Sequence, residues 1–349
     1  MVKRSYFYLG EQNIGIEAPT ELLGRIDRNF EETPFENVST VGDIKIEEGE
    51  YVEFSRDRSK KYLTTRDNAS RDCPGTDFLR YGVLVRTVWQ RDPLHFEVQN
   101  FLPLDETAAL NCFKKIYYNT SSSMNKSLVH GSLVEVGGKG ILITGGCWSG
   151  KTSLTMGFLE RLNGRLVSDG NVLLSCISGN MKGYYLPRPI FVRFHSISLS
   201  SALSTVLTNP EESESIQPFD KEAIQEIITE RKYELDAGLN FSRKKFAELM
   251  EVGTIPSYAI NRIVYTEFNN AGLPKINSVG VEKSHSLLLA REFPKETTLG
   301  NIKHQRDIER PTHSIIGQNW VEGVERIGVS FDARKNLTQD LLEDLICFH

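Results

Sequence analysis

The chain has 349 residues, of which 39% are hydrophobic and 25% are charged. These values are typical of a globular protein with a sizeable core, and the length suits one large domain or two of ordinary size. The formal net charge of −5 gives no overall attraction to nucleic acid or to an anionic membrane, so either partner would need a local basic patch.

The cysteines and the apolar runs argue against further classes of protein. An odd number of cysteines, widely spaced and without a C-x-x-C pair, indicates neither a disulfide framework nor a zinc site. They are Cys73, Cys112, Cys147, Cys176 and Cys347. No apolar run approaches the about 20 residues of a membrane span, and the first residues lead into no apolar signal segment. We expect reduced thiols, a cytoplasmic location and no membrane partner.

Residues 1–102 have the pattern of short strands and turns, which predicts a smaller accessory α+β domain. Strands are predicted at 6–10, 14–16 and 51–54, and a short helix at 21–30. The strand-like runs 81–89 and 94–98 flank a polar segment, 90–93, which is typical of a hairpin loop. No spacing in this region is typical of a catalytic site.

Six basic residues lie between Arg56 and Arg71, ahead of that predicted hairpin. A solvated loop or sheet face is the simpler explanation of such a run. The alternative is a patch that binds an acidic or phosphorylated partner, or the phosphates of RNA.

Residues 103–349 are predicted to form the larger, second domain. Apolar residues at helical spacing predict a helix over 107–118. Further strands are predicted at 133–136, 141–143, 165–174, 259–265 and 326–331, and further helices at 153–162, 197–207, 219–233, 242–251, 282–292 and 337–346. The strand near 165–174 delivers an acidic residue to its end. Strong helix formers around an acidic tract predict a helical insertion at about 208–252.

Residues 145–152 read Gly-Gly-Cys-Trp-Ser-Gly-Lys-Thr, which fits the phosphate-loop pattern G-x-x-x-x-G-K-[ST] between a strand and a helix. Glycines let backbone N–H groups turn toward phosphate oxygens, and the helix N-terminus adds partial positive charge. Lys151 would reach the outer phosphates, and the Thr152 hydroxyl would hold Mg²⁺. The residues expected to contact the nucleotide are Gly145, Gly146, Cys147, Trp148, Ser149, Gly150, Lys151, Thr152 and Ser153.

Two flanking motifs narrow this prediction. His130-Gly131 begins 15 positions before the first loop glycine, and Leu166-Val167-Ser168-Asp169 follows the loop helix. In this order and spacing, the motifs resemble the catalytic domain of the bacterial HPr kinase family, whose P-loop domain is akin to that of PEP carboxykinase. The close match covers about residues 128–174, and weaker similarity extends to about 293. No motif of the family is found in residues 1–102.

The resemblance implies an α/β fold with a PEP carboxykinase-like, HPr kinase-like P-loop domain built on a mixed sheet, beside the smaller N-terminal α+β domain. It implies ATP and Mg²⁺ as cofactors, with Lys151 on the β and γ phosphates and Thr152 on the metal. Asp169 would hold Mg²⁺ or take the proton from the acceptor hydroxyl, and His130 would touch the transferring phosphate or the acceptor. The alternatives are a turn residue for Asp169 and a buried histidine bonded to backbone for His130.

The match is incomplete on the acceptor side. Gly170 stands where the family has a second aspartate, so metal binding would depend on Asp169 alone or on another carboxylate. Glu135 is one candidate, although a solvent-facing strand residue is an equal interpretation. In the stretch that corresponds to the family's Glu-x-Arg-Gly, Phe191 replaces the glutamate while Arg193 is kept.

The remaining departures concern arginines and one aromatic residue. Arg188 and Arg193 would neutralise phosphate charge in the transition state, or form a structural salt bridge. Trp148 occupies a loop position where a small residue is usual, and its ring would stack on a base or an acceptor, or pack in the core. The Arg-rich loop that HPr kinases use on their protein substrate has no counterpart here.

The kept features lie on the nucleotide side and the lost ones on the acceptor side. We therefore expect an ATP-dependent kinase that transfers the γ-phosphoryl group to a hydroxyl, with a Ser or Thr of a peptide or protein favoured as acceptor. A small molecule (a sugar, nucleoside or amino acid) or an RNA hydroxyl is the alternative acceptor. A nucleotide-binding regulatory module without transfer activity is the alternative function. Members of the family are often oligomers, so a homo-oligomer is a further expectation.

Overall fold

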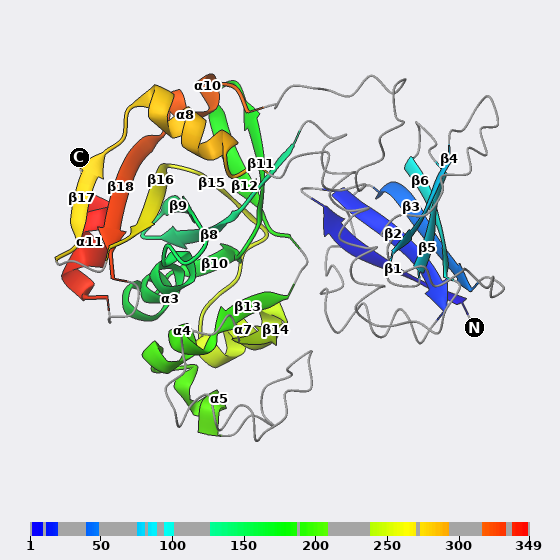
Figure 1. Cartoon of the computed structure of the whole chain (residues 1–349), viewed down its shortest axis with the longest axis horizontal. Coiled ribbons are helices and arrows are strands. Elements are labelled where there is room, and N and C mark those ends of the chain that lie inside the picture. Colours follow the sequence, from blue (N-terminus) through cyan, green and yellow to red (C-terminus); the bar gives the residue numbers. More distant parts are fainter. Residues whose placement is uncertain are drawn as a thin grey trace, which may run out of the picture. The chain divides into compact units, whose positions relative to one another are not determined.

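The computed structural model describes residues 2–9, 12–19, 40–48, 75–80, 83–88, 94–100, 126–186, 189–208, 238–269, 273–292, 316–332 and 337–347 (Figure 1). The chain divides into two compact units, residues 1–120 and 121–349. The predicted boundary near residue 102 stays a prediction, because residues 101–125 lie outside the described ranges.

The first unit contains two groups of strands. A four-stranded sheet has the order β1 (Val2–Leu9), β2 (Gln12–Pro19), β3 (Thr40–Glu48) and β6 (Leu94–Asn100). Strands β1 and β2 are antiparallel, whereas β2, β3 and β6 run parallel to one another. Strands β4 (Gly75–Arg80) and β5 (Val83–Val88) form a separate antiparallel pair.

The predicted hairpin strands 81–89 and 94–98 correspond to β5 and β6, which lie against each other, but no hydrogen-bonded pairing between them is found among the described residues. Within the described part of this unit, β5 hydrogen-bonds with β4, and β6 hydrogen-bonds with β3. Strands β5 and β6 are where the apolar runs predicted them. A run of β-branched residues predicts a strand but does not determine which other strand it pairs with. The predicted strand 51–54, the predicted helices 21–30 and 107–118 and the basic stretch Arg56 to Arg71 lie outside the described residues.

The second unit is organised around a six-stranded mixed sheet. Its order is β10 (Arg165–Ser168), β8 (Gly131–Val136), β9 (Lys139–Gly145), β16 (Arg262–Phe268), β18 (Glu325–Phe331) and β17 (Lys275–Ser278). Strands β9, β16 and β18 are parallel, and β8 runs antiparallel to both β9 and β10. Four carboxyl ends, those of β10, β9, β16 and β18, therefore meet the amino end of β8 at one edge of the sheet.

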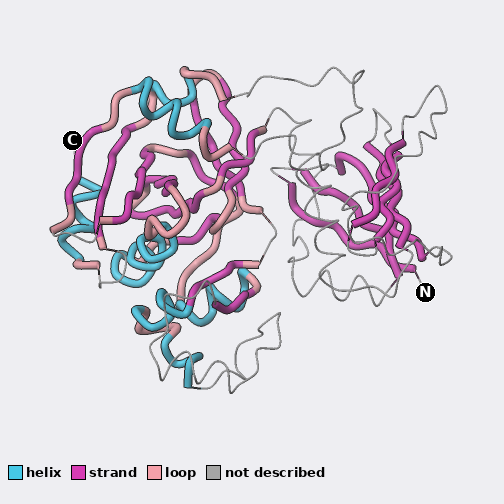
Figure 2. Tube along the Cα trace, in the orientation of Figure 1, coloured by secondary structure: helices cyan, strands magenta, loops and turns pink. Residues whose placement is uncertain are grey.

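Successive residues of these strands face opposite sides of the sheet, as the pleat requires. Ile141 and Ile143 join one core cluster with helix α3 (Lys151–Leu162) and helix α11 (Gln339–Cys347). Leu142 joins the other cluster, with helix α8 (Val281–Leu289), helix α10 (Asn319–Glu322) and a second, antiparallel sheet. That sheet has the order β15 (Ser257–Ala259), β12 (Asn180–Tyr184), β11 (Val172–Ile177) and β7 (Ser127–Val129) (Figure 2).

The region beyond β12 is less helical than predicted. A two-stranded pair, β13 (Ile190–Arg193) with β14 (Gly238–Phe241), packs into the α3 side of the core. The predicted helix 197–207 is divided between α4 (Phe194–Leu199) and α5 (Ser204–Thr208), while α7 (Arg243–Met250) confirms the helix at 242–251. Strand β14 lies within the helical insertion predicted at about 208–252, so the described part of that insertion is a strand followed by a helix. Residues 209–237, with the predicted helix 219–233, lie outside the described chain.

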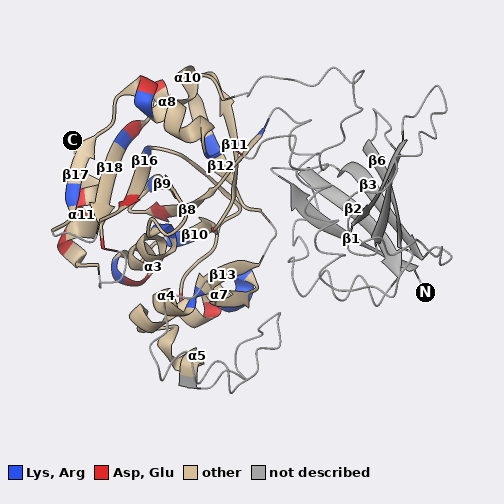
Figure 3. Cartoon of the chain, in the orientation of Figure 1, with Lys and Arg blue, Asp and Glu red and all other residues tan. Residues whose placement is uncertain are grey.

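The local signals around the central sheet are confirmed. Helix α3 ends at Asn163, whose backbone is left-handed with φ 51°, as an Asn-Gly stop predicts. The turn between β8 and β9 uses two glycines with positive φ, 56° and 81°. Basic and acidic residues are interspersed along the described ribbon of this unit (Figure 3). No helix in the described ranges has the length and apolarity that would span a membrane.

Candidate nucleotide-binding site

The loop between β9 and α3 has the backbone that a phosphate loop needs. Strand β9 ends at Gly145 and α3 begins at Lys151, so the first N–H groups of the helix point into the loop. Gly150 has φ 88°, a conformation that glycine adopts without strain. Trp148 has φ 63°, which is unusual for a bulky residue and indicates a constrained loop.

The loop is fastened to the neighbouring strand. The hydroxyls of Ser149 and Thr266 lie 2.7 Å apart, and the Thr266 hydroxyl also donates to the Thr144 carbonyl at 3.3 Å. A Cβ on Gly145 would lie 2.6 Å from the Ser149 hydroxyl and closer still to the Thr266 carbonyl. Because no side chain fits there, Gly145 is required by close packing of β9, the loop and β16.

Lys151 lies inside the loop and is only 9% exposed. Its ammonium donates to the carbonyls of Gly146 at 2.8 Å and Gly145 at 3.2 Å. Burial lowers the pKa of Lys151 to about 8; Asp169 and Cys147 oppose this shift, whereas two nearby arginines add to it. The lysine is thus poised for an anion, whose negative charge would favour the ammonium form.

Asp169 follows β10 at the same edge and is 5% exposed. Its carboxylate accepts a hydrogen bond from the Ser132 hydroxyl of the adjacent strand β8, and its charge acts on Lys151. Antiparallel pairing of β10 with β8 sets Ser168 opposite Leu133. The next residue of one strand, Asp169, therefore lies near the preceding residue of the other, Ser132. The structure therefore places the predicted aspartate beside the loop, held in position by a buried hydroxyl.

His130 lies just before β8 and is half-buried. Its Nδ1 lies 2.8 Å from the carbonyl of Gly170, and because a carbonyl only accepts, Nδ1 carries the proton. A neutral imidazole in this tautomer has Nε2 as its acceptor. The backbone of His130 is fixed as well, by its N–H to the Arg291 carbonyl at 2.9 Å and its carbonyl to the Thr144 hydroxyl at 2.9 Å.

Arg193, the last residue of β13, contacts the loop through Trp148. Its guanidinium carbon lies 4.1 Å from the centre of the Trp148 ring and 5.9 Å from that of Phe191. The indole is 45% exposed, so packing of Trp148 in the core is wrong. The stacked arginine is close enough for its charge to disfavour the ammonium form of Lys151.

Other predicted site residues have different surroundings. Cys147 is exposed beside Lys151, and Thr152 is half-buried at the start of α3. The Ser153 hydroxyl lies 3.4 Å from that of Ser196, so the Ser153 side chain faces α4. Of its predicted nucleotide contacts, only one through the backbone N–H remains. Arg188 lies outside the described residues.

Glu135 is excluded as a second carboxylate of the site. It lies near the other end of β8, where its carboxylate accepts from Arg165 at 2.7 Å and from the Gly138 N–H at 2.7 Å. Burial alone would raise the pKa of Glu135, but these hydrogen bonds outweigh it and the pKa is lowered. Glu135 is buried and stabilises the turn between β8 and β9 through the Gly138 N–H. It is therefore neither a metal-binding carboxylate nor a solvent-facing strand residue.

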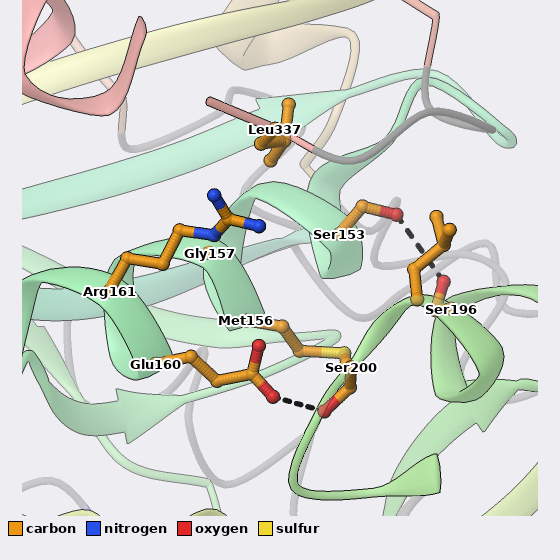
Figure 4. Close-up of a pocket in the computed structure, with 9 residues that line it drawn as sticks. Ser153, Met156, Gly157, Glu160, Arg161, Ser196, Ser200 and Leu337 are labelled. Atoms are coloured by element: carbon orange, nitrogen blue, oxygen red, sulfur yellow. Dashed lines mark hydrogen bonds between the residues drawn. The ribbon is translucent and has the colours of Figure 1, made fainter. Parts of the chain in front are cut away.

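A pocket along α3, lined by both polar and apolar side chains, lies outside the loop. Figure 4 shows the Ser153 and Ser196 hydroxyls at one end and the Glu160 carboxylate with Ser200 at the other. Glu160 accepts from the Ser200 hydroxyl and from the Ala202 N–H at 3.3 Å, so it holds the turn after α4. We therefore assign this pocket to the packing of α4 on α3.

The donors beside the loop fit a magnesium ion bound with a nucleotide. Mg²⁺ on phosphates needs one or two protein oxygens and completes its octahedron with phosphate oxygens and water. The Thr152 hydroxyl and the Asp169 carboxylate would supply such a pair. The described residues include no cluster of three or more His, Cys, Asp or Glu side chains that could hold a metal ion.

Comparisons with known proteins find likenesses among solved structures. No protein-family model matches the chain, and no curated protein matches it. Among solved structures, it is similar to the Hpr(Ser) kinase/phosphatase from Coxiella burnetii. The two share 10% sequence identity at a TM-score of 0.28, over 62% of this chain and 89% of that one. The likeness is distant and concerns the fold alone, so we take the function from the residues around the loop.

Three residues of the site were missed by the sequence analysis. Thr266 and Arg291 come from elements more than 100 positions after the loop, and no motif marks them. Ser132 lies inside the His-Gly strand, where alternation along β8 distinguishes its face from that of Leu133, but the sequence gives no sign of its bond to Asp169.

Proposed function

We propose that the loop at residues 145–152 binds ATP with Mg²⁺ and that the protein is a kinase, transferring the γ-phosphoryl group to a hydroxyl. The observation that carries this proposal is the meeting of Lys151 and Asp169 at one sheet edge beside a helix N-terminus. These are the parts that phosphoryl transfer needs, because its catalysis is mostly positioning and charge neutralisation. We also propose that the second unit has the P-loop architecture shared by HPr kinases and PEP carboxykinase.

Each residue has a role that follows from its place. The loop N–H groups and Lys151 bind the β and γ phosphates, and the Thr152 hydroxyl and Asp169 hold the magnesium ion. Bound magnesium would neutralise phosphate charge and orient the outer phosphates. Asp169 also orients the acceptor hydroxyl and accepts its proton, with the Ser132 hydroxyl fixing the carboxylate. Arg193, stacked on Trp148, neutralises charge that develops on the transferred group.

We favour a Ser or Thr hydroxyl of a peptide or protein as the acceptor. The first unit gives the protein a second folded body, and such a body suits docking of a macromolecule. A small-molecule or RNA hydroxyl is the other outcome of the test below. The homo-oligomeric state and the cytoplasmic location stay predictions.

The test uses the full-length protein with γ-labelled ATP and a cell extract separated into protein, RNA and small-molecule fractions. We expect label in the protein fraction, and its loss with Lys151→Ala and with Asp169→Asn. Glu135→Gln is the matched control, since it neutralises a buried carboxylate at the far end of β8 and leaves the loop intact. Full activity of Asp169→Asn, with an identified acceptor, would contradict the role given to that carboxylate.

A nucleotide-dependent regulatory module is the second candidate, and Gly170 and Phe191 favour it because they stand where the HPr kinase family has carboxylates. In that case ATP binds tightly, Asp169→Ala leaves binding unchanged, and no fraction of the extract is labelled. Calorimetric titration of both proteins with ATP, run beside the labelling experiment, separates the two candidates.

A further inference from the structure

A third cation reaches the loop from a part of the chain that carries no motif. Arg291 lies just after α8, and its Nη2 is 3.6 Å from the position that a Cβ would occupy on Gly146. Its charge disfavours the ammonium form of Lys151, so the two cations are close in space. Like charges gathered beside backbone N–H groups form a surface that favours an anion.

The backbone of Arg291 is held firmly. Its N–H donates to the Leu288 carbonyl at 3.0 Å, and its carbonyl accepts from the His130 N–H at 2.9 Å. The next residue, Glu292, forms an isolated antiparallel β-bridge with Val129, and its carboxylate accepts a hydrogen bond from the Ser127 hydroxyl. The backbone of Arg291 and Glu292 is thereby fixed to β7 and to the start of β8, close to the loop.

The Arg291 guanidinium has no carboxylate partner among the described residues. This distinguishes it from Arg165 and Arg262, which pair with Glu135 and Glu325. An arginine that stabilised the fold would be expected to use such a partner. The Arg291 guanidinium is half-buried beside the glycines of the predicted phosphate loop. Its N–H donors have the planar, forked geometry that suits bidentate contact with phosphate oxygens.

The two arginines approach the loop from opposite faces of the central sheet. Strand β13, which carries Arg193, packs through Ile190 and Val192 into the core on the α3 face. Helix α8, which precedes Arg291, packs through Leu288 into the core on the other face. A phosphate chain in the loop would thus have one arginine on each side and Lys151 at its base.

We propose that Arg291 is a ligand of the outer phosphates of the nucleotide, acting together with Lys151. This inference rests on the proposed function, because it names a further binding residue of the same site. In this proposal Arg291 contacts phosphate and neither base nor ribose. Its contribution to binding is therefore the same for inorganic tripolyphosphate as for ATP.

The test measures ATP and tripolyphosphate binding to the full-length protein by calorimetry, in the presence of magnesium. We expect Arg291→Gln to weaken both ligands about 10- to 100-fold, the size typical of losing hydrogen bonds to a charged group. Arg291→Lys should give an intermediate loss of at least about threefold, since it keeps the charge but not the fork. Lys283→Gln, an exposed cation on the same helix, is the control and should bind within about twofold of wild type.

Binding by Arg291→Gln within about twofold of wild type would overturn the inference and leave the proposed function standing. A loss for ATP without a loss for tripolyphosphate would also overturn it, because the contact would then be to base or ribose. If Arg291→Gln fails to fold by circular dichroism, Arg291→Lys decides alone. If the wild-type protein binds neither ligand, the proposed function and this inference both fail.

Discussion

The guanidinium of Arg193 stacks on the indole of Trp148, with 4.1 Å between the guanidinium carbon and the ring centre. The two residues are 45 positions apart in the chain, one in the phosphate loop and the other at the end of β13. Trp148, which occupies a loop position where a small residue is usual, therefore has a stacking partner. Trp148 holds the arginine against the loop that, in our proposal, carries the phosphates.

Trp148→Ala should lower the rate of phosphoryl transfer about two- to fivefold, because an exposed cation–π contact contributes about 0.5–1 kcal/mol. If the stack positions Arg193 for the transition state, kcat falls and KM changes little. Trp148→Phe should retain part of the activity. Steady-state kinetics on the identified acceptor is the measurement, and a rise in KM alone would contradict this role.

Trp148 should also report nucleotide binding by fluorescence. In a Trp89→Phe background, ATP is expected to change the indole emission while Trp148 is present and to leave it unchanged once Trp148→Phe is added, because the remaining Trp320 is buried in the core away from the loop. An equal change in both proteins would mean that the signal arises elsewhere.

The low pKa of Lys151 predicts a pH dependence of nucleotide binding. With a pKa of about 8 instead of 10.5, the ammonium is lost as the pH rises through about 8, and ATP affinity should fall above that value. Bound phosphates raise the pKa again, so binding at pH 8.5 takes up more protons than binding at pH 7. Calorimetry in two buffers of different ionisation enthalpy measures this uptake; equal uptake at both pH values would contradict it.

The lowered pKa of Lys151 also makes the stability of the nucleotide-free protein depend on pH: stability rises with pH, whereas ATP affinity falls. Between about pH 8 and pH 10.5 the unfolded chain binds a proton on Lys151 that the folded protein lacks, so this residue adds stability as the pH rises through that window. Lys151→Met should lack this gain. Urea unfolding of both proteins across the window tests it, and parallel curves would be the contrary result.

Ser132→Ala removes the buried hydroxyl that donates to Asp169. We expect transfer activity to fall about tenfold or more, since a hydrogen bond to a charged group contributes about 1.5–3 kcal/mol. Ser175→Ala is the control: it removes a buried hydroxyl that lies 3.1 Å from the Tyr184 hydroxyl, in the second sheet. Comparable losses of activity in the two variants would show that Ser132 acts only through stability.

Gly145→Ala should abolish nucleotide binding, because the added Cβ would overlap the Thr266 carbonyl and the Ser149 hydroxyl. The overpacking should also lower the free energy of unfolding by about 1–3 kcal/mol. Gly280→Ala is its counterpart, with nothing within 4 Å of the new Cβ, and it should bind ATP normally. Normal ATP binding by Gly145→Ala would contradict the packing described for the loop.

Much of the second unit follows from sequence patterns that act locally. The loop glycines, the helix from Lys151 and its stop at Asn163 depend on backbone conformations that each residue either allows or forbids, so neighbouring residues are enough to predict them. The single strand predicted at 165–174 is wrong, because it is divided into β10 and β11, which belong to different sheets, and Asp169 lies in the turn between them. The pairing of β5 with β4 and the strand β14 were not predicted, because apolar alternation gives no information on which strand lies next.

The sequence by itself determined the phosphate loop, the cation within it and the acidic residue that follows a strand. Only the tertiary structure decided that Ser132, Thr266 and Arg291 join them, and that Glu135 lies away at the other end of β8. The physical reason is the strand order. Antiparallel β8 and parallel β10, β9 and β16 bring distant residues to one edge, and that order depends on packing across the whole core, which no short stretch of sequence encodes.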